Sequence, residues 1–309
     1  MSYPLNQMDF EKQYRTEEAC RALIKILKWP TGFLCEKCGG KESWEQTRYR
    51  YTCKSCRKQH YLLAGTLFYR SQKSLLEWFR AIWWVVGQKN GVSALGLQRI
   101  MGLGSYETAW AWLHKFRHVM VIPGRDLLSG DVEVDEVFIG GEHPGKRGRG
   151  AEGKTLIGVA VEVNQKKIGR VRLCVIPDAS QLSLHNFISQ NIERGSTIIT
   201  DGWPSYNGLE DKGFSRVIQK PSESVGQDVL PHAHTVASLL KRWLLGTHQG
   251  ATSHTHLPFY LDEFTFRFNR RNSKSRGLLF MRVIEQAVSQ GPASYQQFRS
   301  KNMKEASIG

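Results

Sequence analysis

Residues 131–141 read DVEVDEVFIGG, and this stretch predicts the β-strand around which the larger domain is built. Valines alternate with Glu133 and Asp135, the period of two that places apolar and acidic side chains on opposite faces of a strand. Two glycines follow and end the strand. Upstream, Pro123-Gly124 begins a short linker, so a new domain starts between it and the strand.

The segments after this strand predict the rest of a sheet. TLIGVAVEV (155–163) and IGRVRLCVI (168–176) are two further strands around a polar turn, which makes the first three strands an antiparallel meander. Residues 180–192 predict a helix, and the apolar run 197–200 predicts a fourth strand. Three strands, a helix, a strand and further helices are the order of an RNase H-like fold, so we predict an α/β domain of this class over residues 129–290.

Two carboxylates fall at matching places in that fold. The first and fourth strands are sheet neighbours there, so Asp135 and Asp201, which follows the fourth strand, should lie side by side. Their mutual repulsion is relieved by divalent cations, and a pair of ions is suited to cutting phosphodiester bonds. Alternatively, both residues cap strand ends, because Asp is common beside Gly. Glu133, on the same strand face, and Asp131, at the strand edge, are weaker substitutes for Asp135.

Residues 231–246, PHAHTVASLLKRWLLG, predict a helix with one chemically active face. His234 and Ser238 lie one turn apart, and Lys241 lies two turns from His234. This face therefore offers a possible metal ligand and a cation for phosphate. His232 falls on another face and is the weaker ligand candidate.

The N-terminal part contains two Cys-x-x-Cys pairs separated by a span that suits the two strands of a zinc ribbon. The four predicted zinc ligands are Cys35, Cys38, Cys53 and Cys56. Disulfides are the alternative, but no hydrophobic signal peptide precedes Met8, so we expect a reducing, cytoplasmic setting. The lone thiols Cys20 and Cys174 are expected to be small buried hydrophobes.

Residues 71–122 predict a helix-turn-helix. Ser74 and Glu77 form a capping box before an apolar stripe, and Ser105 begins a second apolar-striped helix after a glycine turn. An ordinary helical hairpin is the alternative. The chain carries 43 Lys and Arg against 28 Asp and Glu, a formal charge of +15 that favours a polyanionic partner. The expected DNA contacts are Arg99, Lys115, Arg117, Lys146, Arg147, Arg149 and Arg242, and His114 and His118 are expected on the same outer surface.

The order of these motifs resembles that of insertion-sequence transposases of the DDE class that carry an N-terminal zinc ribbon. The resemblance rests on CEKC and CKSC followed by AGTLF, on VDEVFIGG and TDGWPSYNGL, and on HTVASLLKRWLLGTHQG and YLDEFTFRFNRR. It implies that Asp135 and Asp201 are the first two metal-binding carboxylates and that Lys241 is the basic residue after the third ligand.

The third position departs from the family pattern. Many relatives have Glu there, whereas this chain has His234 and no acidic residue between Pro231 and Pro258. Imidazole suits manganese or zinc better than magnesium. The acids Asp262 and Glu263 lie farther along, and we interpret them as solvated helix charges or partners for Arg267 rather than ligands.

The resemblance implies a DNA transposase that binds terminal inverted repeats and performs metal-dependent strand cleavage and transfer. Its expected cofactors are structural Zn²⁺ and catalytic Mg²⁺ or Mn²⁺. Its expected partners are repeat and target DNA and further copies of itself, at least as a homodimer, at the bacterial nucleoid and not at a membrane. A catalytically inactive DNA-binding relative and a structure-selective nuclease are the alternatives. The expected division is a helical segment 1–30, a zinc ribbon 31–68, a helix-turn-helix 71–122, the catalytic domain 129–290 and a basic tail 291–309.

Overall fold

A computed structural model describes residues 3–47, 49–140, 154–219, 228–250, 253–293 and 295–299. The chain divides into two compact units. The first, here called the N-terminal unit, combines Met1–Ile122 with Ser273–Gly309, and the second, the sheet unit, is Pro123–Asn272. Within the described ranges, no helix has both the length and the apolar character needed to cross a bilayer.

The N-terminal unit contains a small antiparallel sheet of order β1-β2-β3. Its strands are Ser43–Thr47, Arg50–Cys53 and Gln59–Tyr61. The first Cys-x-x-Cys pair precedes β1, and the second begins at the end of β2. The backbone N–H of Gly39 donates to the carbonyl of Cys35, and that of Arg57 donates to the carbonyl of Cys53. Each pair therefore sits in a tight turn that brings its two sulfurs together.

Helices make up the rest of the N-terminal unit. They are α1 (Gln7–Gln13), α2 (Glu17–Lys28), α3 (Leu75–Gly87), α4 (Ala94–Met101), α5 (Tyr106–Met120), α9 (Arg276–Ser289) and α10 (Tyr295–Arg299). The predicted capping box of Ser74 and Glu77 is present at the start of α3. Gly102 ends α4 in the left-handed conformation that glycine adopts readily, and the turn leads into α5. The predicted helix, glycine turn and helix are thus observed.

α9 belongs to the N-terminal unit, although residues up to 290 were expected in the catalytic domain. Phe280 is fully buried, with its ring centroid 5.4 Å from Phe10 and 5.5 Å from Phe79. The backbone N–H of Leu67 donates to the carbonyl of Ala287 at 2.7 Å. The apolar stripe of α9 therefore completes an aromatic core that α1 and α3 begin, and the observed division differs from the expected one for this reason.

The sheet unit contains five strands in the order β6-β5-β4-β7-β8. Their bounds are Asp131–Ile139 (β4), Thr155–Asn164 (β5), Lys167–Val175 (β6), Thr197–Thr200 (β7) and Ser215–Ile218 (β8). β4, β5 and β6 pair antiparallel, whereas β7 is parallel to both β4 and β8. This is the predicted RNase H-like arrangement, and β8 is an additional strand that the sequence pattern did not indicate.

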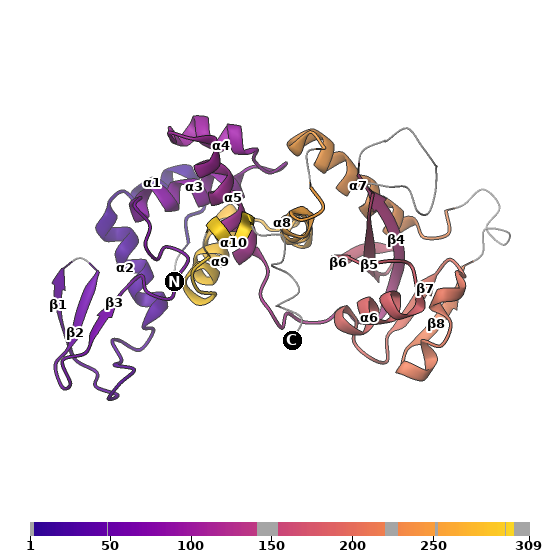
Figure 1. Cartoon of the computed structure of the whole chain (residues 1–309), viewed down its shortest axis with the longest axis horizontal. Coiled ribbons are helices and arrows are strands. Elements are labelled where there is room, and N and C mark those ends of the chain that lie inside the picture. The colour runs from indigo at the N-terminus through magenta and orange to yellow at the C-terminus, as the bar shows by residue number, and fades with distance from the viewer. Residues whose placement is uncertain are drawn as a thin grey trace. The chain divides into compact units, whose positions relative to one another are not determined.

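Helices cover both faces of this sheet (Figure 1). α7 (Pro231–His248) and α8 (Leu257–Asn269) pack on one face, whereas α6 (Gln181–Asn191) packs on the other with the short helix Pro204–Tyr206; a second short helix is Glu210–Lys212. β5 is buried on both faces over Thr155–Glu162. On β4, Val132 and Val134 pack toward α6, which leaves Glu133 and Asp135 on the face that α7 covers.

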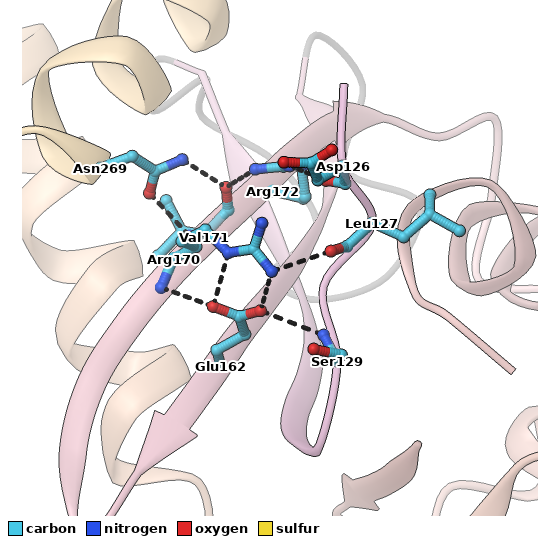
Figure 2. A network of polar contacts seen from close by, with 8 residues as sticks. All are labelled: Asp126, Leu127, Ser129, Glu162, Arg170, Val171, Arg172 and Asn269. Atoms are coloured by element: carbon cyan, nitrogen blue, oxygen red, sulfur yellow. Dashed lines mark hydrogen bonds and ion pairs between the residues drawn. The ribbon is translucent and has the colours of Figure 1, made fainter. Parts of the chain in front are cut away.

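A buried carboxylate fixes the segment that leads into β4 (Figure 2). Glu162 accepts hydrogen bonds from the backbone N–H of Ser129 and from the backbone and guanidinium of Arg170. The same guanidinium donates to the carbonyl of Leu127. On β6, the backbone N–H of Val171 donates to the side chain of Asn269, at the end of α8. The segments entering and leaving the sheet unit are therefore both held on the β5–β6 pair.

Candidate active site and zinc ribbon

The pairing of β4 with β7 places Asp135, in the middle of β4, beside Asp201, which follows the end of β7. The parallel register pairs Glu133 with Ile199, and two further residues along each strand lead to Asp135 and Asp201. Asp201 begins a turn in which one carboxylate oxygen accepts the backbone N–H of Trp203 at 3.0 Å. Gly202 has a φ of +84° in this turn, which glycine adopts without strain. The hydrogen bond from Trp203 holds the Asp201 carboxylate in the turn that follows β7.

Asp135 lies where negative charge is disfavoured. Its side chain is 18% exposed. Burial is the main cause that raises its pKa, and the carboxylates of Glu136 and Asp201 raise it further. A backbone hydrogen bond at Glu136 and the nearby His234 act in the opposite direction, and the net result is a pKa of about 6. A carboxylate crowded by other acids in this way is a good site for a cation.

His234, in the first turn of α7, contacts two carboxylates through its two ring nitrogens. Nε2 lies 3.3 Å from Oδ2 of Asp135, and Nδ1 lies 2.5 Å from Oδ1 of Asp228. Asp228 precedes α7 and was not singled out from the sequence. The structure therefore brings His234 directly to Asp135, with another acid behind the imidazole ring.

His234 and Asp135 are spaced like two neighbouring ligands of a divalent ion. Neighbouring ligand atoms of an octahedral ion with bonds of about 2.1 Å lie about 3 Å apart, close to the 3.3 Å between His234 and Asp135. Among the described residues, only the four ribbon cysteines bring three or more candidate ligand atoms within 4.8 Å of one another. The acidic site thus shows a close His234–Asp135 pair, with Asp201 adding charge from the neighbouring strand.

Glu133 anchors the helix that carries His234. Its carboxylate accepts the backbone N–H groups of His232 at 2.9 Å and Ala233 at 2.8 Å, at the start of α7. It also contacts Nδ1 of His232 at 2.6 Å. A carboxylate at a helix N-terminus satisfies free N–H groups and complements the helix dipole. Glu133 therefore holds α7 in place, and this position explains why an acid on the same strand face as Asp135 is 3% exposed.

His232 is occupied by this anchor. Its Nε2 lies 3.2 Å from the carbonyl of Lys166, while Nδ1 contacts Glu133. Burial alone lowers the pKa of His232, but these two hydrogen bonds outweigh burial and the net pKa is raised. Both ring nitrogens are thus engaged by the protein, which leaves His234 as the imidazole that faces the acidic cluster.

The opposite face of β4 supports the site through Glu136. The hydroxyl of Tyr206 donates to Oε2 of Glu136 at 2.7 Å. Tyr206 is fully buried, and burial followed by the Glu136 charge raises its pKa well above the ordinary value. The Tyr206 hydrogen bond holds the Glu136 carboxylate, whose charge contributes to the raised pKa of Asp135. The alternation of β4 did not single out this pair, because it gives no information on the packing of the TDGWPSYNGL segment.

Farther along α7, Lys241 and Arg242 are both exposed. Lys241 follows His234 by two helical turns, so the two residues share a helical face. The downstream acid Glu263 is 1% exposed and pairs with Arg267 one turn later at 2.8 Å. It is thus a partner for Arg267, as the sequence indicated.

The four ribbon cysteines converge in the N-terminal unit. The sulfurs of Cys35 and Cys56 lie 3.5 Å apart, and those of Cys38 and Cys53 lie 3.6 Å apart. Tetrahedral zinc–sulfur bonds of about 2.3 Å place two sulfurs about 3.8 Å apart, whereas a disulfide requires about 2.05 Å. The sulfur cluster fits one tetrahedral metal ion, and none of these cysteines forms a disulfide.

A buried histidine also contacts this cluster. Nε2 of His60 lies 3.3 Å from the sulfur of Cys35, and His60 is 8% exposed. The sequence pattern did not indicate this contact. His60 lies on β3, after the last of the four cysteines, and is not part of either Cys-x-x-Cys pair.

The residues expected to contact DNA differ in their exposure to solvent. Arg99, on α4, is exposed, whereas Arg117 is 1% exposed and His114 is fully buried. Lys115 lies over the ring of Trp78, and burial lowers its pKa. The expectation that these α5 residues line an outer surface is therefore wrong for Arg117 and His114. α5 is packed on most sides, which helical periodicity could not reveal because α9 and α10 come much later in the sequence.

The remaining predicted contacts, Lys146, Arg147 and Arg149, lie outside the described residues. His118 is half-buried, and Lys115 is also partly covered. At the start of α5, Tyr106 and Glu107 are exposed. On α4 and α5, the exposed side chains lie on one side of α4 and in the first turn of α5.

The fold and the acidic edge together define a transposase-type catalytic unit of the RNase H-like class. Comparison with known families agrees: residues 127–269 match the ISXO2-like transposase domain, and residues 15–59 match the transposase zinc-ribbon domain. Together the two matched segments cover more than half of the chain. No curated protein matches the sequence. The chain belongs to the zinc-ribbon-bearing insertion-sequence transposases, a DDE-type family.

Proposed function

We propose that this transposase cuts DNA at the ends of its insertion sequence and joins those ends to target DNA. The observation that carries the proposal is the contact between His234 and Asp135 at the sheet edge that also holds Asp201. The family match supports the reaction class, and the formal charge of +15 supports a nucleic acid substrate.

The three side chains have distinct places in this proposal. Asp135 neighbours Asp201 across the β4–β7 register and His234 at 3.3 Å, so in this proposal it would hold metal together with each of them. Mg²⁺ or Mn²⁺ bound there would stabilise charge on the reacting phosphate and on the attacking oxygen. Asp201 and His234 would each complete one position. Lys241, on the same helical face as His234, would hold a phosphate of the reacting strand by its positive charge.

The bond changes follow from in-line displacement at phosphorus. A water oxygen attacks the phosphate at the element end, the bond to the 3′ oxygen breaks, and a 3′-hydroxyl and a 5′-phosphate result. In the second step, the freed 3′-hydroxyl attacks a target phosphate. The target's own 3′ oxygen leaves, so one phosphodiester bond forms as another breaks.

DNA recognition is proposed for the N-terminal unit. Structural Zn²⁺ held by the four cysteines would stabilise the ribbon, and the ribbon and helix-turn-helix would bind terminal inverted repeats. Arg99 and Arg242 are exposed and remain proposed DNA contacts. Because two ends must be held together for joining, we propose a dimer or larger assembly on DNA, acting at the bacterial nucleoid.

Strand cleavage and joining by the purified protein test this function. Asp135→Ala and Asp201→Ala should each abolish both steps on end-bearing DNA with Mg²⁺ or Mn²⁺, while binding to that DNA stays near wild type. Glu193→Ala, which removes an exposed carboxylate of the same unit, should leave activity unchanged. Lys241→Ala should slow the reaction less than either Asp substitution.

The alternatives give different results in the same assays. A structure-selective nuclease would cut without terminal repeats and would not join the product to a target. An inactive DNA-binding relative would bind ends and show no metal-dependent cleavage by the wild-type protein. Normal strand transfer by Asp135→Ala or Asp201→Ala would remove these residues from the proposed centre.

A further inference from the structure

The imidazole of His234 contacts a second carboxylate, that of Asp228, on the side of the ring away from Asp135. Oδ1 of Asp228 lies 2.5 Å from Nδ1 of His234, on the opposite side of the ring from Asp135. The same oxygen accepts the backbone N–H of Leu230 at 3.3 Å. Asp228 is therefore itself positioned by the chain just before α7 begins.

This contact selects one form of the imidazole ring. A neutral histidine carries one N–H, and the other nitrogen has a free electron pair. A hydrogen bond from Nδ1–H to the Asp228 carboxylate leaves the electron pair on Nε2, which faces Asp135. Carboxylates that orient a ligating histidine in this way fix both the ring angle and the tautomer.

Asp228 contacts the imidazole of His234 and not Asp135, so any effect of Asp228 on the acidic site passes through His234. The ring of His234 separates the Asp228 contact at Nδ1 from the Asp135 contact at Nε2. The other histidine of this turn, His232, is held by Glu133 and the Lys166 carbonyl. Within the described part of the sheet unit, the contacts of Asp228 thus lead to His234 and not to the two strand carboxylates.

We propose that Asp228 is a positioning residue that holds His234 with Nε2 free to bind the catalytic ion. The inference rests on the proposed function, because it takes His234 as a ligand of that ion. It adds a fourth residue to the centre, one that acts on the imidazole and touches neither the ion nor the DNA.

Mn²⁺ binding by the full-length, zinc-loaded protein tests the proposal without DNA or turnover. Asp228→Ala should weaken Mn²⁺ affinity by about 10-fold to 100-fold, the range found when such supporting partners are removed. Asp228→Asn should lose less, because its amide oxygen can accept the same hydrogen bond. Asp228 is 44% exposed, so these variants should keep the wild-type fold. Glu193→Ala is the matched control and should bind Mn²⁺ normally.

A double-mutant cycle separates positioning from direct ligation. In a His234→Ala background, Asp228→Ala should cause no further loss of Mn²⁺ affinity, because its route to the ion has been removed. An equal loss in both backgrounds would make Asp228 a ligand and overturn the proposal. If Asp135→Ala also binds Mn²⁺ normally, the proposed centre itself fails, an outcome distinct from a failure confined to Asp228.

Imidazole NMR gives a second readout that a purely structural role would not change. In metal-free protein labelled at histidine nitrogen, in alkaline solution, the His234 signal should show the Nδ1–H tautomer. His234→Gln assigns the signal. Asp228→Ala should shift this residue toward the Nε2–H tautomer, and Asp228→Asn should not. An unchanged tautomer in Asp228→Ala, with unchanged Mn²⁺ affinity, would overturn the proposal.

Discussion

Ionisation of Asp135 lowers the stability of the folded protein. Its pKa of about 6 lies above the ordinary value of an Asp carboxyl, chiefly because of burial and then the neighbouring acids. The folded protein therefore holds this proton more tightly than the unfolded chain does. As pH rises from about 4 to about 6, ionisation of Asp135 costs stability, and the full cost is present above that window.

Asp135→Asn should consequently stabilise the metal-free protein. At neutral pH we expect a gain of about 1–3 kcal/mol in the free energy of unfolding of the sheet unit, since one pKa unit corresponds to about 1.4 kcal/mol. The gain should vanish below a pH of about 4, where the wild-type carboxyl is protonated in both states. Denaturant unfolding at several pH values measures it. A gain that is constant with pH would show that packing, not charge, is responsible.

At the scale of single residues, we also expect His234 to set the preference between Mg²⁺ and Mn²⁺. An imidazole favours Mn²⁺ over Mg²⁺, whereas a carboxylate suits both. Wild-type strand transfer should therefore be faster with Mn²⁺, and His234→Glu should raise the ratio of Mg²⁺ to Mn²⁺ activity. His234→Ala should lose most activity with either ion. Rates measured side by side with the two ions test this, and an unchanged rate for His234→Ala would contradict it.

The start of α7 is held by one side chain that crosses from the sheet. Glu133 accepts two backbone N–H groups at its start and contacts His232. Glu133→Ala leaves these donors buried without their acceptor, so the sheet unit should lose about 2–4 kcal/mol of stability. Thermal and denaturant unfolding measure the loss, with Glu193→Ala as the control. A change of less than about 0.5 kcal/mol would show that α7 is held by its apolar face alone.

Helices and strands were predicted well where a local signal marks them, such as alternation, an apolar run or a capping box. The valine alternation predicted β4, the apolar run predicted β7, and Ser74 with Glu77 predicted the start of α3. β8 was missed because it is a short strand whose residues are mostly exposed, so neither alternation nor a long apolar run marks it.

The residues of the candidate site likewise fall into two groups, those that could be predicted from the sequence and those that could not. Asp135 and Asp201 could be paired from the strand order, because that order fixes which strands are neighbours. The Asp228–His234 contact depends on how the chain folds back before α7, and no period in the sequence encodes such a return. The burial of Arg117 likewise depends on helices that follow it by more than 150 residues.

At the scale of the molecule, α9 is needed to close the N-terminal unit. Residues 1–122 alone would expose the aromatic surface that Phe280 covers. We therefore expect this fragment to bind a hydrophobic dye and to unfold without a cooperative transition. A version that joins residues 1–122 to 273–309 through a flexible linker should unfold cooperatively and bind DNA.

Gly277→Ala is a sharper test of the same packing in the full chain. A Cβ at this position would overlap the backbone carbonyl of Pro4, which cannot move aside as a side chain would. The substitution should lower the stability of the N-terminal unit and leave the sheet unit's Mn²⁺ binding intact. Cooperative unfolding of the 1–122 fragment, together with a neutral Gly277→Ala, would show that α9 is dispensable.

The return of α9 also bears on how the protein is made. Chains grow from the N-terminus and fold as they emerge, yet α9 lies beyond α8, the last helix of the sheet unit. The zinc ribbon and the helix-turn-helix are synthesised first, but their unit is completed last. A growing or prematurely terminated chain would therefore lack a finished N-terminal unit, and any function of that unit would arise only after the sheet unit has been made.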